Sequence, residues 1–124
     1  MFKNSKAFGS FSVNDLQKAK DFYGRTLGLE VSQNEEGLDL QIGGGNHFFI
    51  YPKPNHTPAS FTILNFPVQN INETIDMLTR SGVRFEHYDN PVKTDEKGIF
   101  RDEGMQIAWF KDPAGNILSV LQEG

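Results

Sequence analysis

The stretch Trp109-Phe110-Lys111-Asp112-Pro113-Ala114-Gly115-Asn116-Ile117-Leu118-Ser119 carries the clearest structural signal in the chain. Apolar residues lead into its centre, Asp-Pro-x-Gly-Asn, and apolar residues follow it. Pro113 presets φ for the second position of a turn, Asp112 suits the first position, and Gly115 can adopt a left-handed conformation. The stretch therefore predicts a β-hairpin closed by a type I turn with a glycine bulge, and it places Ser119 on the final strand.

The composition indicates an ordinary globular chain. Its 124 residues suffice for one domain or for two small repeats that share a core. Hydrophobic residues make up 37% and charged residues 23%, which is typical of folded proteins. The 11 Phe residues greatly outnumber the 3 Tyr and the single Trp, so we expect a dry core or an apolar pocket.

The charge pattern excludes several classes of partner. The net charge of −4 comes without any basic run, which argues against nucleic acid. No apolar run approaches the roughly 20 residues of a membrane span. We expect no signal peptide, because no apolar h-region follows the first six residues. The chain has no cysteine, which removes disulfides, cysteine zinc sites and thiol nucleophiles. We expect a cytoplasmic protein with neither a nucleic-acid nor a membrane partner.

The first half of the chain predicts a strand, a helix and three further strands. Asn14 or Asp15 can cap the helix, whose apolar face begins at Leu16, and Gly28 can end it. Leu38 to Ile42 alternates cleanly between apolar and polar residues. The expected elements are a strand over 7–13, a helix over 16–27 and strands over 29–33, 38–42 and 48–51.

The second half repeats this order after a proline-rich stretch. Asn70 and Glu73 form the sequence pattern of a capping box before the second helix, which ends near Gly82. The segment from 90 to 104 reads as a long charged loop. The expected elements are strands over 61–68 and 83–88, a helix between them, a short strand near 99–100, and a final hairpin over 105–110 and 116–121.

The two halves align in register. Phe11, Val13, Asp15 and Leu16 match Phe66, Val68, Asn70 and Ile71 at an offset of 55, and Gly28, Leu29 and Val31 match Gly82, Val83 and Phe85 at an offset of 54. Strand, cap, helix face and terminating glycine recur together, which indicates a duplicated βαβββ unit.

These observations predict an α+β fold with two βαβββ modules in tandem. We expect a single domain over 1–124, with modules over 5–53 and 59–124 and a linker over 53–58. A helix covers one face of each sheet, so the other face needs a partner. Two curled mixed sheets around a cavity satisfy this requirement, and such a cavity is a usual place for a small ligand.

The motifs resemble those of the vicinal oxygen chelate superfamily, which includes glyoxalase I, extradiol dioxygenases, fosfomycin resistance enzymes and bleomycin resistance proteins. The resemblance rests on Phe11 to Leu16, Phe22-Tyr23, Leu27 to Leu29, Phe66 to Val68, and Phe110 to Asn116. It covers nearly the whole chain. The superfamily contains isomerases, dioxygenases, thiol transferases and binding proteins, so the resemblance implies the fold and leaves the reaction open.

The resemblance also implies where metal ligands would lie. Metal-dependent members carry ligands five residues before the valine of the first strand, at the matching place in the second module, and three residues after the asparagine of the turn. These positions hold Phe8, Ile63 and Ser119. Phe and Ile cannot coordinate a metal, and a serine hydroxyl is a poor ligand. We therefore expect no metal and no cofactor, with a site built from His47, His56 or His87 as a weaker alternative.

Alternation along the strands predicts the cavity lining. Phe8, Ser10 and Ser12 should face the cavity, while Phe11 and Val13 should face the helix. Trp109 is expected either in the core or as a stacking wall, and the 90–104 loop either as solvated charge or as a ligand contact. The expected ligand-binding residues are Phe8, Ser10, Ser12, Tyr51, Ile63, Asn65, Phe100, Arg101, Trp109 and Ser119.

The sequence favours a metal-independent protein that binds an apolar or aromatic compound for sequestration, resistance or sensing. No acid–base pair or nucleophile stands out. The alternative is an enzyme of the superfamily, a lyase, isomerase or dioxygenase with non-standard or no metal ligands; an interaction module is a third reading. The resemblance further implies a homodimer.

Overall fold

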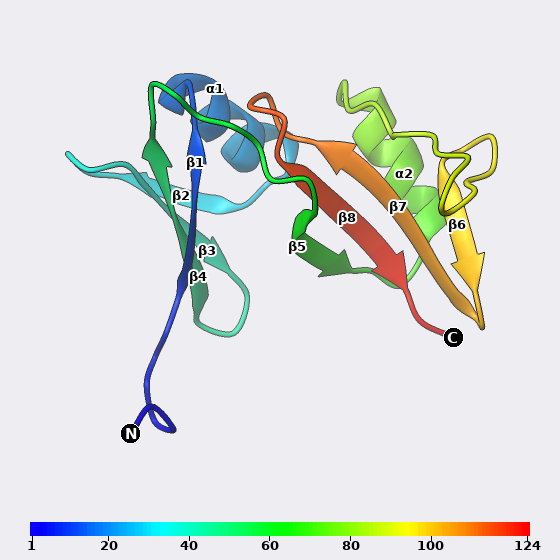
Figure 1. Cartoon of the computed structure of the whole chain (residues 1–124), viewed down its shortest axis with the longest axis horizontal. Coiled ribbons are helices and arrows are strands. Elements are labelled where there is room, and N and C mark those ends of the chain that lie inside the picture. The colour runs from blue at the N-terminus through cyan, green and yellow to red at the C-terminus, as the bar shows by residue number, and fades with distance from the viewer. The chain divides into compact units, whose positions relative to one another are not determined.

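The computed structural model describes all 124 residues, which form two compact units, Met1–Thr57 and Pro58–Gly124. Each unit contains one four-stranded mixed sheet and one helical segment (Figure 1). The α+β class with two tandem modules is therefore confirmed. The module boundaries at 5–53 and 59–124 remain a prediction. No helix is both long and apolar enough to cross a membrane.

In the first unit the strand order is β1-β4-β3-β2. Strand β1 pairs in parallel with β4, and the remaining pairs are antiparallel. Asp15 caps the helix by accepting a hydrogen bond from the backbone N–H of Lys18 at 3.0 Å. The α-helix continues as a π-helix before Gly28, whose φ is +73°. The elements are β1 Gly9–Val13, α1 Leu16–Asp21, the π-helix Phe22–Thr26, β2 Glu30–Gln33, β3 Leu38–Ile42 and β4 Asn46–Pro52.

In the second unit the strand order is β5-β8-β7-β6, which is the same topology. Strand β5 runs parallel to β8, and β7 is antiparallel to both β8 and β6. Asn70 caps the helix by accepting from the backbone N–H of Glu73. The elements are β5 Thr62–Pro67, α2 Ile71–Arg80, β6 Ile99–Asp102, β7 Met105–Lys111 and β8 Ile117–Gln122.

Each sheet has one buried face and one face that carries the candidate site. In the second unit Leu64, Leu118 and Phe110 share a face through their register, and all three are buried. The helix α2 contributes buried Ile71 and Ile75 on this side of the sheet. The opposite face of each sheet is called the open face below. Because side chains alternate along a strand, the register fixes which residues share that face.

The closing hairpin forms where the sequence predicts it, and its turn is organised by a buried carboxylate. The Oδ1 atom of Asp112 accepts from the backbone N–H groups of Ala114 and Asn116, and its Oδ2 accepts from the Asn116 side chain at 3.0 Å. The N–H of Gly115 donates to the carbonyl of Asp112, which closes the turn, and Gly115 has φ +87°. Asp112 and Asn116 are 4% and 2% exposed, so this turn is part of the core.

The expected strand over 83–88 is wrong. That segment forms one isolated bridge, between Phe85 and Phe110, and the β6 strand pairs with β7 instead. The reason is local: Glu103 and Gly104 have φ values of 49° and 86°, which is the geometry of a two-residue type I′ hairpin. The short loop brings β6 onto β7 at low entropic cost, which leaves only the far end of β7 for the 83–88 segment.

Candidate functional site

On the open face of the second unit, one row of side chains crosses three strands. Ser119 on β8 lies opposite Asn65 on β5 and opposite Trp109 on β7. The Ser119 hydroxyl donates to Oδ1 of Asn65 at 2.6 Å, and Ser119 is fully buried. Asn65 itself is exposed, so its amide NH₂ group remains available as a donor. This arrangement joins three of the residues expected from the sequence.

Aromatic rings surround Trp109 on the same face. The Tyr88 ring meets it edge-on at a centroid distance of 5.6 Å, and the Phe100 ring lies at 6.2 Å. The indole N–H donates to Oγ1 of Thr62 at 3.2 Å, which fixes the orientation of the ring. Trp109 is only half-buried. It is therefore neither a core residue nor a free surface residue, and its position suits a stacking wall.

The rim of this aromatic group carries one ion pair. Lys111 Nζ lies 3.6 Å from Glu86 Oε1. Burial raises the pKa of Tyr88 above its ordinary value of 10.0, the Glu86 carboxylate raises it further, and Lys111 opposes both effects. The Tyr88 phenol therefore stays protonated at neutral pH and can act as a hydrogen-bond donor. Tyr88 and Thr62 were not expected from the sequence, since only tertiary contacts bring them to Trp109.

The open face of the first unit carries Ser10, Ser12 and Tyr51. Ser10 lies opposite Phe49, and Ser12 lies opposite Tyr51. The Phe49 and Tyr51 rings stack at 6.2 Å with an angle of 16° between their planes. Ser12 Oγ is 2.6 Å from Nδ1 of His56, so this histidine has a hydrogen-bond partner.

A histidine–carboxylate pair lies on the same open face. Nδ1 of His47 is 2.8 Å from Oδ1 of Asp39, and the Gln41 amide donates to the other carboxylate oxygen. Phe8 stacks on the His47 ring at a centroid distance of 4.6 Å. From the sequence alone, Asp39 reads as a solvent-face carboxylate. Asp39 and His47 lie on adjacent antiparallel strands, and the register places both side chains on the same face of the sheet. Strand alternation in both segments is the sequence signal that could have linked them.

Two expected site residues lie away from these groups. The Arg101 side chain lies on the same face of β6 as buried Ile99, which is the face opposite to that of Phe100. Arg101 forms an ion pair with Asp95 at 2.6 Å. Ile63 lies at the irregularity between Thr62 and Leu64 and has no register partner. The charged loop therefore contributes Phe100 to the aromatic group while Arg101 is engaged elsewhere.

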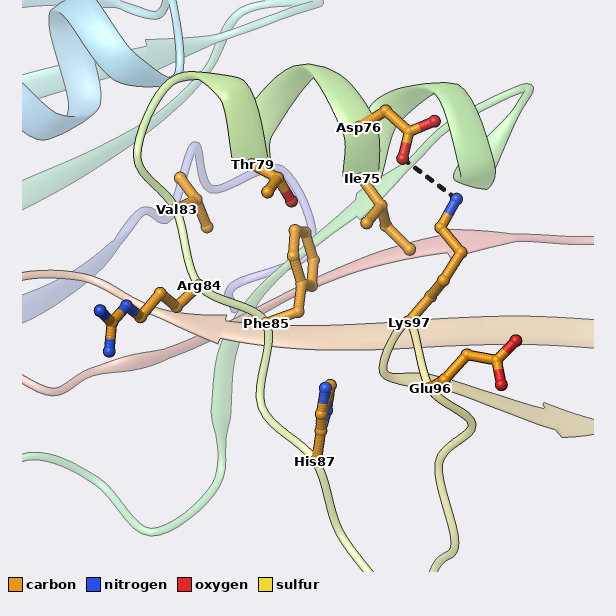
Figure 2. A pocket seen from close by; sticks show the side chains of 9 residues that line it. All are labelled: Ile75, Asp76, Thr79, Val83, Arg84, Phe85, His87, Glu96 and Lys97. Atoms are coloured by element: carbon orange, nitrogen blue, oxygen red, sulfur yellow. Dashed lines mark ion pairs between the residues drawn. The ribbon is translucent and has the colours of Figure 1, made fainter.

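A separate pocket of about 440 Å³ lies beside α2, and Figure 2 shows the side chains that line it. Ile75, Val83 and Phe85 supply its apolar side chains, and Lys97 bridges to Asp76 at 3.1 Å along its edge. The Arg84 side chain points away from the centre of the pocket in this view. Its rim carries both signs of charge, and none of the expected site residues lines it. The pocket therefore has no pattern that selects one class of ligand.

The residues at the metal positions implied by the resemblance do not fit a metal. Phe8 is stacked on His47, Ile63 has no donor atom, and the Ser119 hydroxyl is committed to Asn65. No group of three or more His, Cys, Asp or Glu side chains is arranged as a ligand set in the described chain.

Residues 9–120 match the family model described as the Glyoxalase/Bleomycin resistance protein/Dioxygenase superfamily. The chain belongs to this superfamily. The superfamily includes enzymes and binding proteins, so membership does not choose between them.

Several solved structures share this fold. A putative glyoxalase family protein from Bacillus anthracis matches with a TM-score of 0.71 at 20% identity, covering 100% of both chains. TnmS3, an antibiotic binding protein from Streptomyces sp. CB03234, matches with 0.65 at 24% identity, covering 95% of this chain and 96% of its own. The fosfomycin resistance protein FosX from Listeria monocytogenes matches with 0.70 at 15% identity, covering 95% and 92%.

Proposed function

We propose that this protein binds a small aromatic compound on the open face of its second unit, for sequestration, resistance or sensing. The observation that carries the proposal is the half-buried Trp109, flanked by the Tyr88 and Phe100 rings on a face that also bears Asn65. Aromatic groups arranged around a few convergent polar atoms are typical of ligand sites. An antibiotic binding protein among the similar structures supports the same type of role.

The hydrogen-bond inventory restricts the chemistry of the ligand. Ser119 occupies the acceptor oxygen of Asn65, which leaves the Asn65 amide NH₂ as a donor. Thr62 accepts from the Trp109 indole, so its own hydroxyl proton can be donated elsewhere. Both groups therefore offer protons. A ligand with an aromatic ring and an acceptor oxygen, such as an aromatic ketone, matches them.

The location and assembly expected from the sequence are part of the proposal: a cytoplasmic homodimer without a metal. The competing function is an enzyme of the superfamily, a lyase, isomerase or dioxygenase. The arrangement around Trp109 favours binding, because it presents aromatic surface and neutral donors but no nucleophile.

Because Trp109 is the only tryptophan, its indole N–H gives one assignable signal in a ¹H–¹⁵N spectrum. We expect acetophenone to shift this signal saturably, and methyl cyclohexyl ketone, of similar size but without the aromatic ring, to shift it little. Trp109→Leu should weaken acetophenone binding about tenfold, in keeping with the loss of an aromatic contact of roughly 1 kcal/mol together with its buried area. Acetophenone binding to this variant is followed through the NMR signals of the Tyr88 ring, because the variant lacks the indole.

The matched control is Phe2→Leu, which removes an exposed ring outside both open-face groups and should leave acetophenone binding unchanged. Equal shifts with both ketones would contradict the aromatic site. An unchanged affinity in Trp109→Leu would also contradict it.

A further inference from the structure

The His47–Asp39 pair lies on the open face of the first unit, within one antiparallel pair of strands. His47 on β4 lies opposite Gln41 on β3, and Asp39 is two residues from Gln41 on the same side of the sheet. The Nδ1–Oδ1 distance is 2.8 Å, and the two side chains are 35% and 28% exposed. The pair is therefore accessible from solvent while both members remain partly enclosed.

This geometry selects one tautomer of the imidazole. An ionised carboxylate can only accept hydrogen bonds, so Nδ1 of His47 carries the proton that is shared with Asp39. In the neutral ring, the lone pair is then on Nε2. No protein group contacts Nε2 through a hydrogen bond, so this basic nitrogen is available to a ligand.

Neighbouring side chains hold both members of the pair in place. The Gln41 amide donates to the second oxygen of Asp39. The Phe8 ring lies on the imidazole with 26° between their planes. A base whose orientation is fixed by a third group is the arrangement that general-base chemistry requires.

We propose that His47 and Asp39 form a proton-transfer site, independent of the aromatic site around Trp109. Nε2 of His47 takes a proton from an acidic O–H or activated C–H group of a flat, apolar ligand that lies beside the Phe49 and Tyr51 rings. The bond to hydrogen breaks, its electron pair stays on the ligand, and the new N–H bond produces an imidazolium. Asp39 is a positioning residue, since its carboxylate fixes the tautomer and stabilises the imidazolium charge.

The experiment uses 5-nitrobenzisoxazole, an aromatic carbon acid, with the full chain. Removal of its C3 proton by a base forms a nitrile as the N–O bond breaks, and the coloured 2-cyano-4-nitrophenolate leaves. We expect the protein to exceed free imidazole at equal concentration. His47→Gln should lower the protein-dependent rate at least about tenfold, within the range typical of general-base catalysis. The variant keeps a neutral polar side chain at a strand position that is 35% exposed, which preserves the fold.

His87→Gln is the matched control, because His87 is exposed and lies outside both open-face groups; it should keep the full rate. Asp39→Asn should lower the rate while moving the His47 ¹⁵N signals toward the tautomer with the proton on Nε2, a change that a merely structural role would not produce. The proposal is overturned if His47→Gln retains the wild-type rate, if His87→Gln loses as much, or if the protein does not exceed imidazole. Acetophenone binding at Trp109 should be unaffected by His47→Gln, which separates this test from that of the proposed function.

Discussion

The two open faces have the same topology but differ in the strand that carries the carboxylate or the aromatic ring of the central row. In the first unit, the central row across the sheet reads Ser10, Phe49 and Asp39; in the second, the matching row reads Asn65, Ser119 and Trp109. The second row carries its aromatic ring on the strand where the first row carries its carboxylate. A duplicated backbone therefore supports a proton-transfer pair on one face and an aromatic, neutral surface on the other, because a fold fixes positions and not side-chain chemistry.

We expect the greatest destabilisation from a charge placed in the second row. Ser119→Glu installs a carboxylate at a fully buried position, and Lys111 on the same face is already paired with Glu86. We expect a loss of about 4 kcal/mol in the free energy of unfolding, since an unpaired buried charge is that costly. Urea unfolding followed by circular dichroism measures it.

The matched control is Ser10→Glu in the first row, where the side chain is exposed. We expect a change of less than about 0.5 kcal/mol there. A similar loss for both variants would show that the two rows do not differ in burial.

The second difference lies in the turns that close the two central hairpins. In the first unit the turn is exposed Gly43 to Gly45, whereas in the second it is organised by buried Asp112. Asp112→Ala leaves the backbone N–H groups of Ala114 and Asn116 without this acceptor, so we expect a loss of about 3 kcal/mol in thermal or urea unfolding.

Gly44→Ala supplies the comparison for the first turn. Gly44 has φ +59° and nothing near an added Cβ, so we expect a loss of only about 1 kcal/mol from backbone strain. If Asp112→Ala cost no more than Gly44→Ala, the Asp112 turn would not be the more stabilising of the two.

The smallest expected effect concerns the edge strands. In the first unit β2 follows Gly28 almost directly, whereas β6 is preceded by a loop in which Asp95 accepts from the N–H groups of Lys97 and Ile99 and from Arg101. Burial tends to raise the pKa of Asp95, but these hydrogen bonds outweigh it and hold the pKa below its ordinary value of 3.8.

Because the pKa of Asp95 is lower in the folded state, its contribution to stability is complete above pH 3.8 and is lost as the pH falls through the folded value. We expect the unfolding temperature of the wild type to fall more steeply than that of Asp95→Asn as the pH is lowered below 3.8. Parallel curves for the two proteins would contradict this role.

Much of the fold could be predicted from local patterns. The cap at Asn70 and the turn at Asp112 are set by residues within a few positions of one another, so the sequence shows them directly. For the first helix the sequence left Asn14 and Asp15 as alternatives, and the structure selects Asp15. Asn65 and Ser119 were both expected as ligand-binding residues, but it is the register of β5 and β8 that places them opposite each other. The 83–88 segment was predicted as a strand because its residues alternate between apolar and polar. The alternation has a structural basis, since Val83 is buried and Phe85 packs on Phe110. The tight hairpin at Glu103–Gly104 pairs β6 with β7 in place of the 83–88 segment. Alternation within a segment does not show which of two segments will pair with a given strand.

By itself, the sequence determined the repeated βαβββ order, the superfamily pattern and the absence of the usual ligand types at Phe8, Ile63 and Ser119. Only the tertiary structure paired His47 with Asp39, gathered Tyr88 and Phe100 around Trp109, and turned Arg101 away from them. The physical reason is range. Caps, turns and alternation depend on neighbours along the chain, whereas these contacts depend on cross-strand register and on the path of long loops, which the packed sheet alone fixes.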